Sequence, residues 1–330
     1  MEKCEAVKSG IFNPWKSRGD EMASRNVVNL DALIPRADFT EELTPTAPPD
    51  IRALDIRQLE AGFLAHSLRK PDFQRETAAW SPEKIVDLIH TFIDANLIPS
   101  VILWQAGRHV FALDGAHRLS AILAWIHNDY GDEIKSRNHF GGIIPDDQMR
   151  LAKRTRDLVK KTIGTYADYM VAEKAGTADP TINRRISNMT TKGIPCQWIA
   201  TVEFKVAEES FFKINQAATP LDPIEERILR SRMSPHALSA RALMHGGTGT
   251  KYWKDFASEI KTEIEAISKQ VYNDLFEPPI GDMPLKSIDL PIAGRGYNAL
   301  PFVFDLVNLA NGREIPDSTQ KKGSKRKIAG

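Results

Sequence analysis

The sequence predicts an α+β fold in its first two thirds, followed by a mostly helical C-terminal region. Two short β-rich runs, "SVILW" and "HVFAL", are separated by "QAGR", which is typical of a hairpin or a closely linked strand pair. Segments with helical periodicity stand on both sides of this pair, and the alternation in "WIATVEFKV" (198–206) predicts another strand. Beyond residue 250 we expect mostly helices.

Helix boundaries follow from capping residues and apolar spacing. In "SPEKIVDLIHTFIDANLIP" (81–99), Ser81 can cap the helix and Pro82 takes its first position, ahead of an apolar face. After the "DG" at 114–115 the apolar period changes to that of a helix of about eleven residues. The stretch 210–232 holds two helical pieces, the second starting at Asp222.

Composition limits the class of protein. The chain has 330 residues, of which 42% are hydrophobic and 26% charged, as in ordinary globular proteins. Its net charge of +1 predicts no nucleic-acid or membrane partner, so such binding would need a local patch. Cys4 and Cys196 are too few for a disulfide framework or a cysteine zinc site, which fits a reducing compartment. Without a span-length apolar run or a signal peptide, we expect a cytoplasmic protein with no membrane partner.

Four regions are expected along the chain. Residues 1–50 lack periodicity and end in "TPTAPPD", so they predict a loosely ordered lead-in. A patterned domain covers 51–235, a helical C-terminal region covers 236–316, and a disordered basic tail covers 317–330. The cations of the tail are explained equally well by DNA affinity and by solubility.

The junction "VFALDGAHRLSAILAW" (110–125) concentrates chemistry between a strand and a helix. Asp114 is placed to cap the helix, and Gly115 lets the backbone approach a ligand. The free N–H groups of the first helical turn suit an anion such as a phosphate, which Arg118 could clamp while His117 handles a proton. Each cation at a helix N-terminus costs about 0.3–1 kcal/mol unless an anion compensates. The alternative is that Asp114 caps, Gly115 turns and both cations are solvated.

The motif "DGAHRLSAI" resembles the DGQQR motif of the ParB/sulfiredoxin-like superfamily, in the branch that includes the NTPase half of GmrSD-type restriction systems. It is also similar to the DGQHR form of DndB-like proteins from DNA phosphorothioation clusters. Two further blocks, "PDFQRETAAWSPEKIVDLIHTFIDANLIPSVILW" and "FFKINQAATPLDPIE", resemble family segments in the same order. Together the blocks cover roughly residues 65–235.

The resemblance implies a ParB-like small mixed sheet with flanking helices that binds a nucleoside triphosphate, ATP or GTP, with Mg²⁺ as a candidate companion ion. Relatives couple hydrolysis to DNA restriction or modification, as in phage defence. Carried over residue by residue, the catalytic positions are Asp114, His117 and Arg118. The nucleotide- and phosphate-binding positions are Gln74, Arg75, Gly115, Ser120, Lys213 and Asn215.

Departures from the family motif keep a second function open. Ala116 and His117 stand where DGQQR has amides, and the histidine agrees with the DndB-like form. The alternative is therefore a non-catalytic DNA-binding regulator or adaptor that keeps the fold and has lost turnover. No HNH-type nuclease block follows, so restriction would need a separate nuclease or modification subunit. The histidines show no metal-ligand spacing such as H-E-x-x-H, and the oligomeric state stays open, a homo-oligomer included.

A basic run is the candidate DNA-binding surface, with a solvated helix face as the alternative. It contains the single acid Asp157 and six cations: Arg150, Lys153, Arg154, Arg156, Lys160 and Lys161. Trp80 and Trp104 could stack on a base, although tryptophans beside apolar runs are more often core residues.

Overall fold

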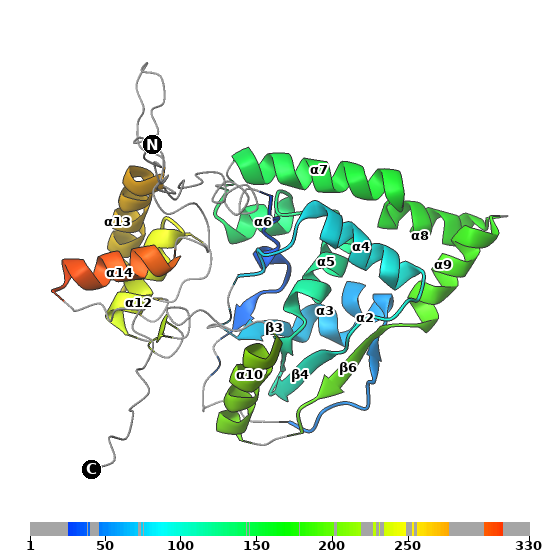
Figure 1. Ribbon diagram of the computed structural model, residues 1–330, viewed down its shortest axis with the longest axis horizontal. Helices are drawn as coiled ribbons and strands as arrows, with labels where there is room; N and C mark the ends of the chain where they lie inside the picture. Colours follow the sequence, from blue (N-terminus) through cyan, green and yellow to red (C-terminus); the bar gives the residue numbers. More distant parts are fainter. Residues whose placement is uncertain are drawn as a thin grey trace, which may run out of the picture.

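The computed structural model shows a mixed six-stranded sheet with helices on both faces, so the predicted fold class is confirmed (Figure 1). It describes residues 26–37, 39, 46–71, 74, 76–142, 144, 146–177, 179–200, 203–218, 227–228, 231, 234–248, 253, 256–276 and 300–312. The strands, in the sheet order β1-β3-β5-β4-β6-β2, are β1 (Arg36–Ala37), β3 (Leu68–Pro71), β5 (His109–Asp114), β4 (Val101–Ala106), β6 (Ile194–Trp198) and β2 (Ala53–Leu54).

Strand direction creates one edge that matters for function. Strands β1, β3 and β5 are neighbours and run parallel, so their carboxyl ends, Ala37, Pro71 and Asp114, meet on one side of the sheet. We call this side the carboxyl edge. Strand β5 follows β4 after a turn in which Gly107 has φ +55°, and the two strands pair antiparallel, which confirms the predicted hairpin.

The helices account for most of the described chain. They are η1 (Asp31–Leu33), α2 (Ile56–Glu60), α3 (Phe63–Ser67), α4 (Pro82–Ile93), α5 (Ala116–His127), α6 (Ile134–His139), α7 (Asp146–Thr162), α8 (Tyr166–Ala175), α9 (Pro180–Thr191), α10 (Phe204–Ala218), α12 (Pro235–Met244), α13 (Ser258–Phe276) and α14 (Leu300–Ala310). Helix α4 starts as predicted, because the Ser81 side chain accepts the N–H of Lys84 at 3.4 Å and Pro82 takes the first position. No helix in this part of the chain has the length and apolar character to cross a bilayer.

Alternation along the central strands builds two cores. Val110 and Ala112 of β5 face the larger core, to which α4 and α5 contribute. Phe111 and Leu113 face the other side of the sheet, where they pack with α10 in a smaller aromatic cluster that includes Trp104. Trp104 is therefore a core residue, the more common of the two interpretations.

The predicted strand over 198–206 is wrong in most of its length. Strand β6 ends at Trp198, and helix α10 already begins at Phe204. Phe204, Ala207 and Phe211 follow helical spacing and cover the smaller core. The short stretch up to residue 206 alternates by chance, and tertiary packing decides for the helix.

Part of the expected N-terminal lead-in is ordered. Leu30, Leu33 and Ile34 are buried in the main core, and β1 pairs with β3. The backbone N–H of Val28 also donates to the carbonyl of Trp80 at 2.8 Å. A two-residue strand and a three-residue 3-10 helix are too short to give a periodic pattern, so the sequence could not reveal them.

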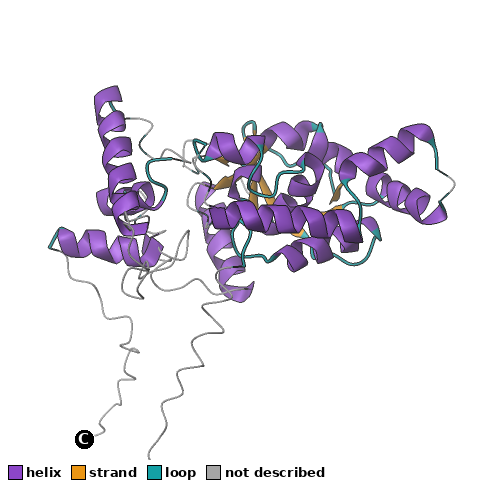
Figure 2. Ribbon diagram, turned by 90° about the horizontal axis from the view of Figure 1, so that it is seen from above, coloured by secondary structure: helices purple, strands orange, loops and turns teal. Residues whose placement is uncertain are grey.

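Helices α6 to α9 form most of residues 134–191, a stretch without a clear periodic pattern in the sequence. The turn before α6 is fixed by buried Asp129, whose carboxylate accepts the N–H groups of Gly131 and Ser136, both at 3.0 Å. Figure 2 shows α12, α13 and α14 as a group beside the sheet domain, which confirms the helical C-terminal region. Of the helical piece expected from Asp222, the structure describes only Arg227, Ile228 and Ser231, the first two as helix, and the basic tail at 317–330 lies outside the described residues.

Candidate functional site

The strand-to-helix junction places the motif at the carboxyl edge, in a different way from the prediction. Asp114 is still part of β5, and Gly115 is the N-cap of α5, so the prediction that Asp114 caps the helix is wrong. Gly115 has φ +89°, which L side chains rarely adopt, and a Cβ there would lie 2.4 Å from Cγ1 of Val101. No side chain caps the first turn of α5, which leaves its N–H groups for another acceptor.

Arg118 is held by its own chain. Its Nη2 donates to Oδ2 of Asp114 at 2.8 Å and to the carbonyl of Ser100 at 3.3 Å. The Arg118 side chain is 18% exposed and that of Asp114 is 36% exposed, so solvent and small ligands reach the pair. An ion pair of this partly exposed kind contributes only about 0–1 kcal/mol, which is a small barrier to exchange for a stronger anion.

The side chains of His117 and Trp80 form an aromatic pair next to the Asp114–Arg118 ion pair. Their ring centroids are 5.7 Å apart and the planes differ by 27°, so the rings stack. The ammonium of Lys84 lies 4.8 Å from the centroid of the Trp80 ring. Trp80 is half-buried, unlike Trp104, so it is the tryptophan that accompanies the motif.

Gln74 follows β3 at the same edge. Its side-chain Oε1 is buried and receives no hydrogen bond from the described residues, while its backbone carbonyl accepts from Arg36. Arg75, predicted beside it, lies outside the described residues.

The remaining predicted phosphate ligands are less well placed. Ser120 is fully buried inside α5, so a ligand arriving from solvent at the carboxyl edge does not reach its hydroxyl. Lys213 lies on α10, its side chain is 76% exposed, and it pairs with Glu209 at 3.6 Å. Asn215 belongs to α10, but its side chain is not among those described.

A buried cluster of charged side chains contacts the loop that carries Gln74 and Trp80. Asp31 binds Arg36 at 3.0 Å and also pairs with Lys70 of β3, and all three side chains are at most 4% exposed. Asp31 Oδ1 also accepts the backbone N–H of Thr77 at 2.9 Å, and Lys70 Nζ donates to the Thr77 hydroxyl at 3.1 Å. The cluster therefore fixes the loop on which Trp80 approaches His117.

Burial shifts the pKa values of the cluster. Burial alone would raise the pKa of Asp31, but Arg36, Lys70 and His139 together lower it far below its ordinary range. Burial lowers the pKa of Lys70 to about 8 and that of His139 to about 4.

The cluster also reaches the C-terminal helices. Glu76, next to the cluster, is 3.1 Å from Nε2 of His245, the C-cap of α12. Burial raises the pKa of Glu76, although the nearby His245 acts in the opposite direction. The C-terminal region thus contacts the same loop that carries Trp80.

This cluster was not predicted from the sequence. Two local features of the sequence indicate it: a lysine inside the β3 run "LRKP" and an aspartate inside the apolar run "NLDALIP". Each stands next to residues that are buried in the core. Charged side chains are rarely buried unless they are paired, but the partner is a matter of tertiary structure.

Residues 57–233, more than half of the chain, match the family model described as the N-terminal domain of GmrSD restriction endonuclease. The chain belongs to this family. Among curated proteins and solved structures, no match was found. Membership in the GmrSD N-terminal family associates the chain with a restriction or phage-defence system and with DNA, and the matched range includes the motif and helix α7.

The basic run of this GmrSD-family chain forms α7, which lies along the outside of the domain (Figure 1). Two of its cations have structural partners, because Arg156 binds Asp132 at 2.7 Å and Arg154 binds Glu83. Four others are exposed and form no ion pair with a described residue: Arg150, Lys153, Lys160 and Lys161. Arg150, Lys153 and Lys161 line an open hollow of about 430 Å³.

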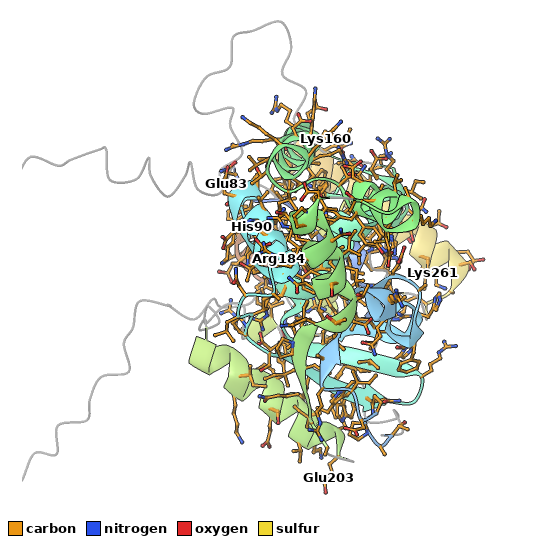
Figure 3. The ribbon with its side chains drawn as sticks, turned by 90° about the vertical axis from the view of Figure 1, so that its right-hand side faces the viewer. Glu83, His90, Lys160, Arg184, Glu203 and Lys261 are labelled. Atoms are coloured by element: carbon orange, nitrogen blue, oxygen red, sulfur yellow. The ribbon has the colours of Figure 1, made fainter. Side chains whose placement is uncertain are left out.

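Figure 3 shows the domain from the right-hand side of Figure 1, the side of α8 and α9. Lys160 lies at the top, and Glu83, His90 and Arg184 lie below it. The Arg184 side chain of α9 is 65% exposed, and its Nη2 lies 3.8 Å from Oδ1 of Asp94. We call Arg150, Lys153, Lys160 and Lys161 the α7 cations. Within the described ranges, no three His, Cys, Asp or Glu side chains converge in a way that would hold a metal ion.

Proposed function

We propose that this chain binds a nucleoside triphosphate, ATP or GTP, at the carboxyl edge and serves a DNA restriction or phage-defence system. The observation that carries the proposal is the start of α5, whose first turn has no side-chain cap and which presents Arg118 and His117 at a sheet edge. Helix N–H groups and an arginine are suited to phosphate oxygens. Family membership supports the restriction context.

Phosphate binding would exchange the partner of Arg118. In the structure this guanidinium binds Asp114, and a phosphate with two or more negative charges competes well for it. The exchange would release the Asp114 carboxylate towards a Mg²⁺ ion carried by the nucleotide, which usually keeps one or two protein carboxylates and several waters. His117 would contact the phosphates or the base from its stack on Trp80.

Hydrolysis and binding without turnover are two versions of this function. Turnover needs a water aligned with the terminal phosphate and positive charge around it. The His117 imidazole can accept the proton of the attacking water, whereas Ala116 has no side-chain amide to hold that water. A DNA-binding regulator without turnover is the second candidate function, and the α7 cations favour it independently of the motif.

Nucleotide binding tests the assignment of the edge. Arg118→Ala and His117→Ala are each expected to weaken ATP or GTP binding about tenfold or more, because each removes a phosphate or stacking contact. Binding is measured by isothermal titration calorimetry, and phosphate release is measured with and without DNA. Lys192→Ala, an exposed cation after α9, is the matched control. Unchanged affinity in both motif variants would refute the site, and nucleotide binding without phosphate release would select the regulator.

DNA binding tests the α7 cations. Replacing all four with alanine is expected to weaken duplex binding and to flatten its dependence on salt, since each lost phosphate contact removes nearly one unit from the slope. The measurement is a fluorescence-anisotropy titration at several salt concentrations. Lys213→Ala on α10, across the sheet, is the control. An identical salt slope in the fourfold variant would exclude α7 as the interface.

A further inference from the structure

A second cavity of about 400 Å³ lies away from the carboxyl edge, between η1, α2, α3, α5 and α6. It reaches the last turns of α5 through Leu123 and His127, and the first residue of β3, Leu68. Its remaining aliphatic wall comes from Ala32, Leu33, Ile34, Pro35, Leu59, Leu64 and Ala65. The volume is in the range of pockets that hold small organic molecules.

The polar groups of this cavity are mostly basic. They are Glu60, His66, His127, Lys135, Asn138 and His139. Glu60 already accepts the hydroxyl of Tyr166 at 2.6 Å. This hydrogen bond occupies one oxygen of Glu60, whose charge still acts on His127, so the basic groups are the ones that an anion would contact.

Lys135 and His127 are the two basic groups on which nearby acids act through their charge, Asp129 on both and Glu60 on His127. Burial lowers the pKa of Lys135, and burial together with the nearby Lys135 lowers that of His127. Neither forms an ion pair with a described acid. Asp129, whose charge acts on both, already accepts the N–H groups of Gly131 and Ser136 and the Ser136 hydroxyl. An anion would supply the charge that this carboxylate does not.

We propose that this cavity is a second ligand site, which binds a small organic anion with its head group against Lys135 and His127 and its body on the aliphatic wall. A phosphate monoester and a carboxylate share this chemistry. An ammonium and an imidazole bind either head group through charge-assisted hydrogen bonds, and the apolar wall contributes through the area it removes from water.

His139 gives this site a route to the motif. It lines the cavity, and its Nε2 is 3.8 Å from Oδ2 of Asp31, the centre of the buried charge cluster. Asp31 in turn holds the N–H of Thr77 in the loop that carries Trp80. An occupied cavity is thereby connected to the carboxyl edge through polar contacts, while its binding chemistry does not depend on the proposed nucleotide site.

The experiment is calorimetric titration of the full chain with AMP, 4-phenylbutyrate and adenosine. We expect AMP or 4-phenylbutyrate to bind, which also tells a phosphate ester from a carboxylate, and adenosine to bind at least tenfold more weakly than AMP if AMP is the ligand. Lys135→Ala is expected to weaken binding about tenfold. Ala65→Trp, at a partly exposed position on α3, fills the cavity and should abolish binding, with thermal unfolding as the check that it folds.

Three results would overturn the second site. They are no binding by either anion, unchanged affinity in both Lys135→Ala and Ala65→Trp, and a loss of binding in Arg118→Ala but not in Lys135→Ala. The last result would place the probe at the carboxyl edge instead. Because the nucleotide test uses Arg118 and His117 and this test uses Lys135 and Ala65, failure of one site is distinguishable from failure of the other.

Discussion

Replacing Gly115 with alanine is expected to lower the free energy of unfolding by about 2–5 kcal/mol. The backbone there has φ +89°, and for a residue with a Cβ this left-handed conformation costs about 1–2 kcal/mol. The new Cβ would also lie 2.4 Å from Cγ1 of Val101, and overpacking of this kind adds about 1–3 kcal/mol. Urea unfolding followed by circular dichroism measures the change.

Gly107 supplies the matched control. It has φ +55° in the β4–β5 hairpin, but a Cβ there would meet no atom within 4 Å. Gly107→Ala should therefore cost only the backbone part, about 1–2 kcal/mol. A Val101→Ala background should recover part of the loss at Gly115, because it removes the nearest clashing atom. Equal losses for the two glycine variants would show that the contact with Val101 is relieved at little cost.

The motif glycine thus has a reason in the fold itself. A position that requires both a positive φ and no side chain needs glycine whether or not a phosphate binds above it. A ligand is inferred instead from Arg118 and His117, which helix geometry does not require at an N-terminus. Loss of stability in the Gly115 variant and loss of nucleotide binding in the Arg118 variant are separate expectations.

Local patterns in the sequence predicted the elements that present the motif. Ser81 and Pro82 define the start of α4, and the change of apolar period after residue 114 marks α5. The cap at Asp114 was wrong because the sequence does not show that β5 extends to this residue and that its carboxylate meets Arg118 one helical turn later. A strand end shifted by one residue changes which side chain is free to cap.

Long-range contacts were beyond sequence reasoning. Asp31 lies in a segment expected to be loosely ordered, yet it pairs with Lys70 from another strand. Glu76 meets His245 from the C-terminal helices, and Arg156 of the basic run turns inward to Asp132. Composition and periodicity describe single segments, whereas these pairs depend on which segments the sheet brings together.

Asp31→Asn is expected to lower the free energy of unfolding by about 3–5 kcal/mol, since it leaves the buried Lys70 and Arg36 charges without their counter-ion. Lys70 can release its proton, because burial lowers its pKa to about 8, and this limits the loss. Denaturant unfolding at pH 7 measures the change. The double variant Asp31→Asn/Lys70→Met should lose less than the sum of the two single losses, because the two side chains interact directly.

The destabilisation by Asp31→Asn is expected to depend on pH and to become smaller at acidic pH. Arg36, Lys70 and His139 hold the pKa of Asp31 far below its ordinary range, against the effect of burial. An unfolded aspartate has a pKa of about 3.9, so the stability from ionised Asp31 is fully present above that pH and is lost as the pH falls towards the folded pKa. The difference between the natural protein and Asp31→Asn should therefore be largest near pH 7 and shrink below about pH 4. A difference that stays constant down to pH 3 would mean that the asparagine acts through lost hydrogen bonds to the N–H of Thr77 rather than through charge.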